Sequence, residues 1–505
     1  MKQQADSFER FAETHAARAD LKRKAVRGAV FMASGSGIEF AVRLASIPIL
    51  ARLLSPEQFG LVAMVTAFTA IADGIKDLGL GAATVQRQGI DRHQVTNLFW
   101  VNTAAGVLIA VAFCALSDAI AGFYHDSRLV QISIVLSFVF VWSGLSVQHE
   151  ALMNRQLRQG ELAMIRVVAV VVSIGAAIAL ALDGWGYWAL VWREVIRSAV
   201  IAVGVWARCP WIPGLPCARA GTGDLLRFGG ELSLTHLLIS AILAADRLII
   251  GRFFGAGAVG LYRQAQQLLE APIEQLNAPI RGVSMSALSA LQHDPDRYRR
   301  YYEKIVLLVA LATIPLGLFA AVYAYEVTLL ILGPSWTDAT VFVMIFGIAV
   351  AVRPAVATSA LVLISCGHST RYLIVAIAHG ALLTVFLFLG IRWGAEGVAV
   401  AHVGASLVLM VPKLYYSFVN SPVGLGTFFG AVRTPAIAAG VMVAGLLVLR
   451  ELMPLGGTIV PLSAGAAVGG ALYLGTWLLQ PGGRAQFDAL ARDLVAALRR
   501  RSAPE

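Results

Sequence analysis

The stretch AADRLIIGRFFGAGAVGLYRQAQQLLEAPIEQLNAPIR, residues 244–281, places a regular series of polar side chains inside an apolar chain. Asp246 and Arg247 are adjacent within a hydrophobic run. Further polar residues then follow three or four positions apart, and we call them the polar stripe: Arg263, Gln267, Glu270, Glu274, Asn277 and Arg281. This spacing places all of them on one face of a helix. Lipid tails cannot solvate such a face, so it is expected to line the protein interior or a water-filled cavity.

The composition indicates a membrane protein. The chain has 505 residues, of which 58% are hydrophobic and 14% are charged, whereas soluble domains carry about 25% charged residues. Apolar runs long enough to cross a bilayer as helices recur along the whole chain. The sequence therefore predicts an all-α integral membrane protein with about fourteen transmembrane helices.

The apolar runs and the basic residues predict how the chain is divided. Lys and Arg gather in both tails and in alternate loops, with Lys413 counted in one such loop, and this bias places both termini in the cytoplasm. The expected parts are a basic cytoplasmic tail (1–27), an N-terminal six-helix lobe (28–207), a cytoplasmic linker (208–228), a C-terminal six-helix lobe (229–417), two additional transmembrane helices (418–480) and a second basic cytoplasmic tail (481–505).

Two similar decamers indicate an internal repeat. RLLSPEQFGL starts at Arg52 and RFFGAGAVGL starts at Arg252, with Gly60 and Gly260 at matching places. GWGYWALV from Gly184 likewise resembles GAEGVAVA from Gly394. Both copies begin on the same side of the membrane, so we expect two lobes related by a parallel repeat, an architecture used by alternating-access carriers.

Other function classes lack their sequence signals. The four cysteines are dispersed and form no CxxC pair, so neither a disulfide framework nor a metal site is expected. No HExxH or G-x4-G-K-[ST] motif occurs, so we expect no metal and no ATP. The basic residues lie in short loops and tails, so no nucleic acid partner is expected. No signal peptide is expected either. A membrane glycosyltransferase or polymerase would need paired carboxylates beside a large external loop, and none is visible.

Several segments resemble one transporter family. They are ARLLSPEQFGLVAMV (51–65), DLGLGAATVQRQ (77–88), ADRLIIGRFFGAGAVGLY (245–262) followed by Pro272 and Pro279, and SALSALQHD (286–294). Together with the span count, they resemble the Wzx-like polysaccharide transporters of the multidrug/oligosaccharidyl-lipid/polysaccharide exporter superfamily, which serve lipopolysaccharide or exopolysaccharide biosynthesis. The resemblance implies a non-enzymatic flippase. It would move an undecaprenyl-diphosphate-linked oligosaccharide across the bacterial inner membrane, working with membrane lipid and alongside glycosyltransferases and a polymerase.

Such a cargo needs a polar and preferably cationic path for its head group. Guanidinium groups stay charged and donate hydrogen bonds in a fork that suits a diphosphate. The candidates for cavity-lining, substrate-binding residues are Arg43, Arg193, Arg197, Arg247, Arg353 and the six residues of the polar stripe. The candidates for ion coupling are Glu39, Asp246, Glu270 and Glu274. No cofactor is expected, and an H⁺ or Na⁺ gradient is an energy source for such a carrier.

Plainer interpretations stand beside these. Glu39 and Arg43 are four residues apart and could neutralise each other, and Asp246–Arg247 could form a structural ion pair to a neighbouring helix. Alternative functions are a peptidoglycan-precursor flippase and an ion-coupled small-molecule antiporter of the same superfamily.

Pro272 and Pro279, which lie on the same predicted helix as the polar stripe, predict a kink. The matching face of the second span carries Ala67, Ala70, Gly74 and Asp77, so the stripe is expected mainly in the second lobe.

Overall fold

The computed structural model describes residues 18–73, 79–87, 89–217, 223–452, 457–484, 486–488 and 492. In these ranges the regular structure is helical throughout and includes no strand. The all-α fold class that the apolar runs predict is therefore confirmed. Residues 1–17 of the predicted N-terminal tail, and most of the predicted C-terminal tail, lie outside the described residues.

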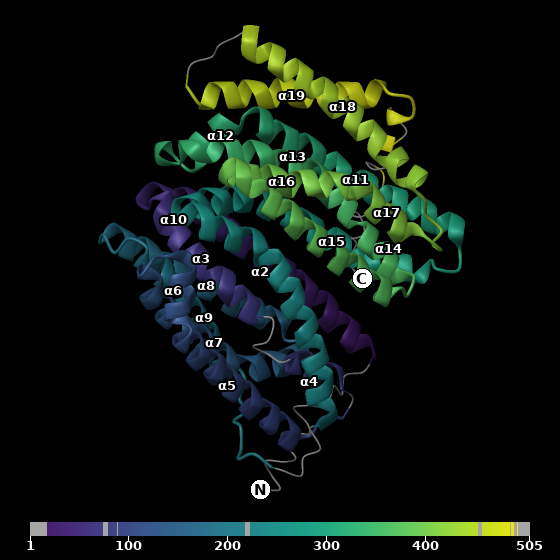
Figure 1. Ribbon diagram of the computed structural model, residues 1–505. Helices are drawn as coiled ribbons and strands as arrows, with labels where there is room; N and C mark the ends of the chain where they lie inside the picture. The colour runs from purple at the N-terminus through teal and green to yellow at the C-terminus, as the bar shows by residue number, and fades with distance from the viewer. Residues whose placement is uncertain are drawn as a thin grey trace. The chain divides into compact units, whose positions relative to one another are not determined.

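The chain divides into two compact units, Met1–Gly260 and Leu261–Glu505. The helices of the first unit are α2 (Arg18–Leu53), α3 (Pro56–Asp73), α4 (Leu80–Gln86), α5 (Arg92–Ala115), α6 (Ser117–Tyr124), α7 (Arg128–Arg155), α8 (Gln159–Leu182), α9 (Trp188–Arg208) and the first part of α10 (Gly223–Ala290) (Figure 1). Within it, α7 packs against α5 and α9, and α8 packs against α2 and α9. Because the division falls inside α10, the lobe boundaries expected at residues 208–228 stay predictions.

The second unit contains the rest of α10 and the helices that follow. They are α11 (Pro295–Val322), α12 (Ala324–Ile331), η1 (Pro334–Ala339), α13 (Thr340–Ala357), α14 (Ser359–Ser365), α15 (Ser369–Gly390), η2 (Ile391–Trp393), α16 (Gly394–Val408), α17 (Met410–Phe418), α18 (Leu425–Leu452) and α19 (Ile459–Leu479). Helix α11 packs against α13 and α18, and α19 packs against α18 at the C-terminal end of the chain, drawn in yellow in Figure 1.

Among the described residues, eight segments are long and apolar enough to cross a membrane. They are Arg92–Ala115, Arg128–Arg155, Gln159–Leu182, Pro295–Val322, Pro334–Ser365, Thr370–Phe418, Leu425–Leu452 and Ile459–Leu479. The segment Thr370–Phe418 has 49 residues, enough for two crossings. Helices α2, α9 and α10, which carry most of the charged candidates, are not in this set. The chain is thus a multi-pass membrane protein, and the count of about fourteen spans remains a prediction.

Large apolar side chains point outward along these helices, as a lipid-facing surface requires. On α5, for example, Leu108 is 69% exposed and Val111 is 59% exposed. Small residues occupy the places where helices meet closely. Gly317 of α11 lies against the backbone of Gly347 and Ala351 on α13, and Gly347 lies against Gly317 and Ala321. Such contacts let two helix backbones approach without a side chain between them.

Helix α10 is interrupted at Gly255. The backbone there has φ 78° and ψ −177°, which is not helical and which glycine adopts without a Cβ penalty. The break falls between the two spans that the apolar runs predict at residues 229–252 and 258–288. Pro272 and Pro279, which predicted a kink, both lie inside the helix.

The two decamers of the repeat meet inside the first unit. A Cβ on Gly60 of α3 would overlap the carbonyl oxygen of Ala256, and a Cβ on Gly260 would overlap the carbonyl oxygen of Pro56. Each glycine therefore packs against the other copy of the decamer, four positions before the matching glycine. In the second pair of repeated segments, Gly184 and Gly394 both have a positive φ, of 81° and 79°. The local backbone thus follows the repeat seen in the sequence.

Candidate functional site

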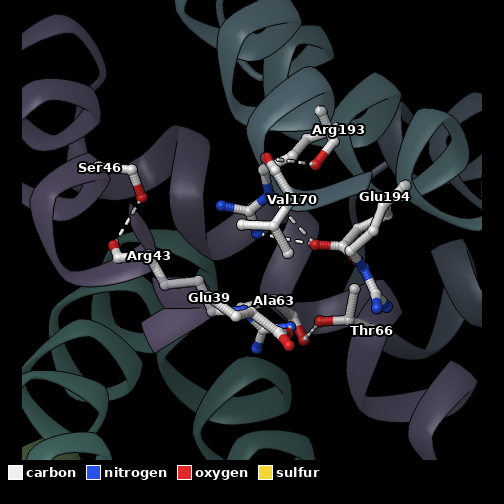
Figure 2. Close-up of polar contacts among 10 residues, drawn as sticks. Glu39, Arg43, Ser46, Ala63, Thr66, Val170, Arg193 and Glu194 are labelled. Atoms are coloured by element: carbon white, nitrogen blue, oxygen red, sulfur yellow. Dashed lines mark hydrogen bonds and ion pairs between the residues drawn. The ribbon is translucent and has the colours of Figure 1, made fainter. Parts of the chain in front are cut away.

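Four helices of the first unit carry a group of polar side chains (Figure 2). On α2, Arg43 donates to Glu39 one turn earlier, as the local spacing predicted for a neutralising pair. On α9, Arg193 Nη2 lies 2.8 Å from Glu194 Oε1, and Arg197 Nε lies 3.3 Å from Glu194 Oε2. Figure 2 also shows Thr66 of α3, which donates to the carbonyl of Ala63.

The charges of this group do not balance. Glu39 and Arg43 cancel, but among the described residues Glu194 is the one carboxylate that pairs with both Arg193 and Arg197. All five of these side chains are partly exposed. The most exposed are those of Arg43, at 52%, and Arg197, at 37%. The group therefore carries an excess positive charge on partly accessible guanidinium groups, which suits an anionic ligand.

Asp246 and Arg247 lie in the first part of α10, within the first unit. Asp246 is buried and accepts a hydrogen bond from the backbone N–H of Arg247 at 2.7 Å. The Arg247 Nε lies 3.9 Å from Asp246 Oδ1, so the two side chains also attract each other. The expected ion pair to a neighbouring helix stays a prediction, because this contact is formed within a single helix.

The polar stripe lies on α10 in the second unit, where its members have different surroundings. Arg263 donates to Gln266 at 3.3 Å. Gln267 is half-buried, Asn277 is buried, and Glu274 is exposed. Gln264 and Gln266, which are not members of the stripe, are buried as well. The polar surface of α10 is thus broader than the single face predicted from spacing.

Two ion pairs fix the carboxylates of the stripe. Glu270 Oε1 accepts from Arg353 Nη1 on α13 at 2.6 Å, and both side chains are about one-third exposed, at 33% and 36%. Glu274 pairs with Arg281 two turns further along α10, with one contact at 3.1 Å. The sequence analysis compared this stripe with a face of the second predicted span. On that face Ala67 is buried, and Gly74 and Asp77 lie outside the described residues.

Two half-buried titratable residues of the second unit were not among the sequence candidates. Lys413, which the sequence analysis counted in a cytoplasmic loop, lies inside helix α17 and is half-buried. His379 of α15 is also half-buried, and its Nδ1 is buried without a partner among the described residues. The available signal was a lysine inside the apolar segment 395–417. It was set aside because Lys413 is near the predicted end of that segment.

Charged side chains also cluster at the turn before α7. Arg128 pairs with Glu57 of α3 and with Asp126, each at 2.7 Å. The hydrogen bonds from Arg128 hold the pKa of Asp126 below its ordinary value. Glu57 lies at the start of α3, so its pair with Arg128 connects the start of α3 to the start of α7.

No group of three or more metal-ligating side chains occurs among the residues that the structure describes. The charged candidates are arginines paired with single carboxylates. Such groups can bind an anion or exchange a cation, but they do not resemble the paired acids of a glycosidase.

Comparison with known proteins gives the family. Residues 49–341 match the family described as "Polysaccharide biosynthesis protein", which is more than half of the chain. The chain belongs to this family. The resemblance to the family of Wzx-like polysaccharide transporters is thereby confirmed.

Two relatives show how far the similarity extends. The chain is 28% identical over 324 residues to the lipopolysaccharide biosynthesis protein WzxC of Escherichia coli (strain K12), covering 63% of this chain and 65% of that relative. It is 26% identical over 455 residues to the succinoglycan biosynthesis transport protein ExoT of Rhizobium meliloti (strain 1021), covering 86% of this chain and 88% of ExoT. The match to WzxC thus spans less than two thirds of that protein.

Solved structures share the fold of this family member. The lipid II flippase MurJ, in an inward closed conformation, matches with a TM-score of 0.70 at 10% identity, covering 92% of this chain and all of MurJ, 100%. A multidrug resistance MATE family transporter of the MOP superfamily matches with a TM-score of 0.57 at 17% identity, covering 75% of this chain and 94% of that structure. At these identities the likeness concerns the fold alone.

Proposed function

We propose that this protein is a flippase for an undecaprenyl-diphosphate-linked oligosaccharide, acting by alternating access in the bacterial inner membrane. The product would enter synthesis of a surface polysaccharide such as exopolysaccharide, capsule or O-antigen. The match of residues 49–341 to a polysaccharide biosynthesis family carries this proposal. The similarity to ExoT, a succinoglycan biosynthesis transport protein, covers 86% of this chain and supports the proposal.

The charges of the candidate residues suit the head group of this cargo. A diphosphate carries several acceptor oxygens, and arginine forks bind such groups through paired hydrogen bonds. The first unit offers Arg193 and Arg197 around a single carboxylate, and the second offers Arg353 and Arg281. The isoprenoid tail would stay in the lipid, so only the polar head group needs these side chains.

Coupling to an ion gradient belongs to the same proposal. Glu39, Asp246, Glu270 and Glu274 each face an arginine. If cargo oxygens displace a carboxylate from its arginine, that carboxylate is left to bind H⁺ or Na⁺. This exchange would link movement of the head group to a cation gradient without ATP.

The proposed setting follows from the cargo. Both termini would lie in the cytoplasm, where glycosyltransferases build the oligosaccharide on its lipid. A polymerase would use it after translocation to the periplasmic face.

Deletion of the gene tests the proposal directly. The deletion strain should lose the surface polysaccharide and accumulate lipid-linked repeat units on the cytoplasmic face of the membrane. Accumulation of lipid-linked peptidoglycan precursor instead would assign the protein to that alternative. Normal surface polysaccharide without any accumulated intermediate would refute both.

A further inference from the structure

The chain between α9 and α10 begins with an apolar segment, residues 209–217, which we call the strap. Its sequence is CPWIPGLPC, and it contains no charged residue. Prolines recur at every third position, at 210, 213 and 216. This spacing favours an extended chain with three residues per turn, and the structure, which describes the whole strap, places no helix or strand in it. Residues three apart therefore share one edge of the strap.

One edge of the strap is hydrogen-bonded to α5. Trp100 Nε1 donates to the carbonyl oxygen of Gly214 at 2.8 Å. Asn97 bonds both backbone groups of Cys217: its Nδ2 donates to the Cys217 carbonyl at 2.6 Å, and its Oδ1 accepts from the Cys217 N–H at 2.8 Å. Gly214 and Cys217 are three residues apart, as a shared edge requires.

Trp211 continues this edge three residues earlier. Its carbonyl oxygen lies 3.2 Å from His149 Nε2 of α7, within hydrogen-bond distance. Trp211 is 5% exposed, and its ring meets that of Phe99 on α5 edge-on, with centroids 5.9 Å apart. The strap is therefore fixed to both α5 and α7 along residues 211, 214 and 217.

These contacts place the strap beside the ends of two spans rather than beyond them. Trp100 follows the start of α5 at Arg92 by eight residues, about 12 Å along the helix. His149 precedes the end of α7 at Arg155 by six residues, about 9 Å along the helix. Both helices are long and apolar enough to cross a membrane. The strap thus lies at the depth where tryptophan rings mark the membrane interface.

Another edge of the strap exposes Ile212 and Leu215 to the surroundings. These residues are three apart, and they are 69% and 86% exposed. On α5, Trp100, Val107 and Val111 share one helix face and are 41%, 43% and 59% exposed. This is the apolar face that meets lipid. Because Trp100 also holds the strap, the exposed apolar edge of the strap continues that face.

We propose that the strap lies in the membrane interface, with Ile212 and Leu215 inserted among lipid acyl chains. Removal of such side chains from water is favourable, whereas backbone N–H and C=O groups are costly in lipid unless they are bonded. Three of the nine strap residues are prolines, which have no N–H. Three of its carbonyls are within hydrogen-bond distance of side chains of α5 and α7. A loop in water would need neither feature.

The partner in this proposal is the bilayer itself, so the placement does not depend on the cargo that the protein carries. It changes the expected nature of the linker at 208–228, which would be membrane-bound over the strap. The connection between α9 and α10 would then be held to the first unit both by hydrogen bonds and by lipid.

Accessibility of a spin label in lipid nanodiscs tests the placement. The label is attached to Ile212→Cys or Leu215→Cys in the full-length protein, after serine has replaced the partly exposed cysteines Cys114, Cys217 and Cys366. Buried Cys209 stays. Molecular oxygen concentrates in lipid, and a neutral nickel chelate concentrates in water, so the collision rates of the label with each report its surroundings.

Two further label sites provide the references. Leu108→Cys lies on the lipid-facing surface of α5, and Arg297→Cys lies at an exposed site at the start of α11. Both strap labels should collide with oxygen about as often as the Leu108→Cys label. They should collide with the nickel chelate several-fold less often than the Arg297→Cys label.

Trp100→Phe tests whether the bond to Gly214 sets the depth of the strap. The change removes the indole N–H and keeps an aromatic ring. The label at Leu215→Cys should then collide with the nickel chelate several-fold more often. Trp206→Phe is the matched control, because Trp206 Nε1 donates to Leu145 of α7 and not to the strap. An unchanged rate in Trp100→Phe would overturn the part assigned to this bond.

Frequent collision with oxygen and rare collision with the nickel chelate at both strap sites would support the proposal. Rates like those of Arg297→Cys would overturn it. Rare collision with both reagents would also overturn it, because protein rather than lipid would then cover the strap. If the serine-substituted protein does not fold, p-benzoylphenylalanine at position 212 replaces the label in a chain with its native cysteines. Photo-crosslinks to lipid would support the proposal, and crosslinks to protein, or none, would overturn it.

Discussion

Gly60 and Gly260, which hold the same place in the two repeated decamers, pack reciprocally: each lies against the backbone of the other decamer. Gly60 lies under the carbonyl of Ala256, and Gly260 under the carbonyl of Pro56. The repeat is therefore more than a similarity of sequence. Its two copies meet through the residue that has no side chain, where α3 crosses the first part of α10.

Substitution of either glycine should separate these helices. Gly60→Ala or Gly260→Ala places a methyl group where a carbonyl oxygen lies, so we expect a loss of about 1–3 kcal/mol in the free energy of unfolding. Thermal unfolding of the purified protein measures this. Gly257→Ala is the matched control, because a Cβ there meets no atom within 4 Å. An unfolding midpoint for Gly60→Ala equal to that of Gly257→Ala would contradict the close contact.

The Glu274–Arg281 pair is expected to matter for transport rather than for folding. Both side chains are at least partly exposed, so their loss should cost little stability. Arg281→Ala and Glu274→Ala should each reduce export of the surface polysaccharide about tenfold or more, equivalent to about 1.4 kcal/mol or more. Arg297→Ala, which changes an exposed arginine at the start of α11, should export normally. Normal export by well-expressed Arg281→Ala protein would refute a role for this end of the stripe.

Glu194 is expected to hold two arginines together in the first unit. Glu194→Gln leaves Arg193 and Arg197 without their shared counterion, and we expect a loss of about 1–3 kcal/mol. Glu57→Gln provides a comparison, because Glu57 pairs with Arg128 at an exposed site where the expected loss is below about 1 kcal/mol. Unfolding midpoints of the two variants give the difference. Equal midpoints would indicate that Glu194 does not serve as a counterion.

The Asp126–Arg128 pair predicts a pH dependence. The pKa of Asp126 is lower in the folded protein than in the unfolded chain, where it is about 3.9. Its stabilisation is therefore complete above the unfolded value and is lost as pH falls through the folded value. Asp126→Asn should be slightly less stable than the wild type at pH 7, by less than about 1 kcal/mol. The two proteins should converge as pH is lowered below about 4. A difference that stays constant or widens over that range would contradict the assignment.

The sequence predicted the local features because they depend on spacing. The Glu39–Arg43 pair follows from an interval of one helical turn, whereas the two decamers gave the matching glycines but not their contact. Apolar runs were sufficient for the all-helical membrane class. The break at Gly255 also agrees with the gap between two predicted spans.

Contacts between distant segments could not be predicted in this way. Glu270 and Arg353 are separated by 83 residues, and spacing within one helix says nothing about a partner on another. Lys413 was assigned to a loop because counting basic residues uses only their distance from a span end. The structure places it inside helix α17 instead.

Transport by the purified protein tests the central claim most directly. Proteoliposomes would carry an undecaprenyl-diphosphate-linked oligosaccharide in both leaflets, and an added glycosidase would digest only the outer pool. With wild-type protein, the digestible fraction should rise from about half towards completion as inner-leaflet cargo reaches the enzyme. Vesicles containing the Arg353→Met variant should stay near half. A wild-type fraction that also stays near half, with and without an imposed H⁺ or Na⁺ gradient, would contradict the proposal that this chain is a flippase for lipid-linked glycans.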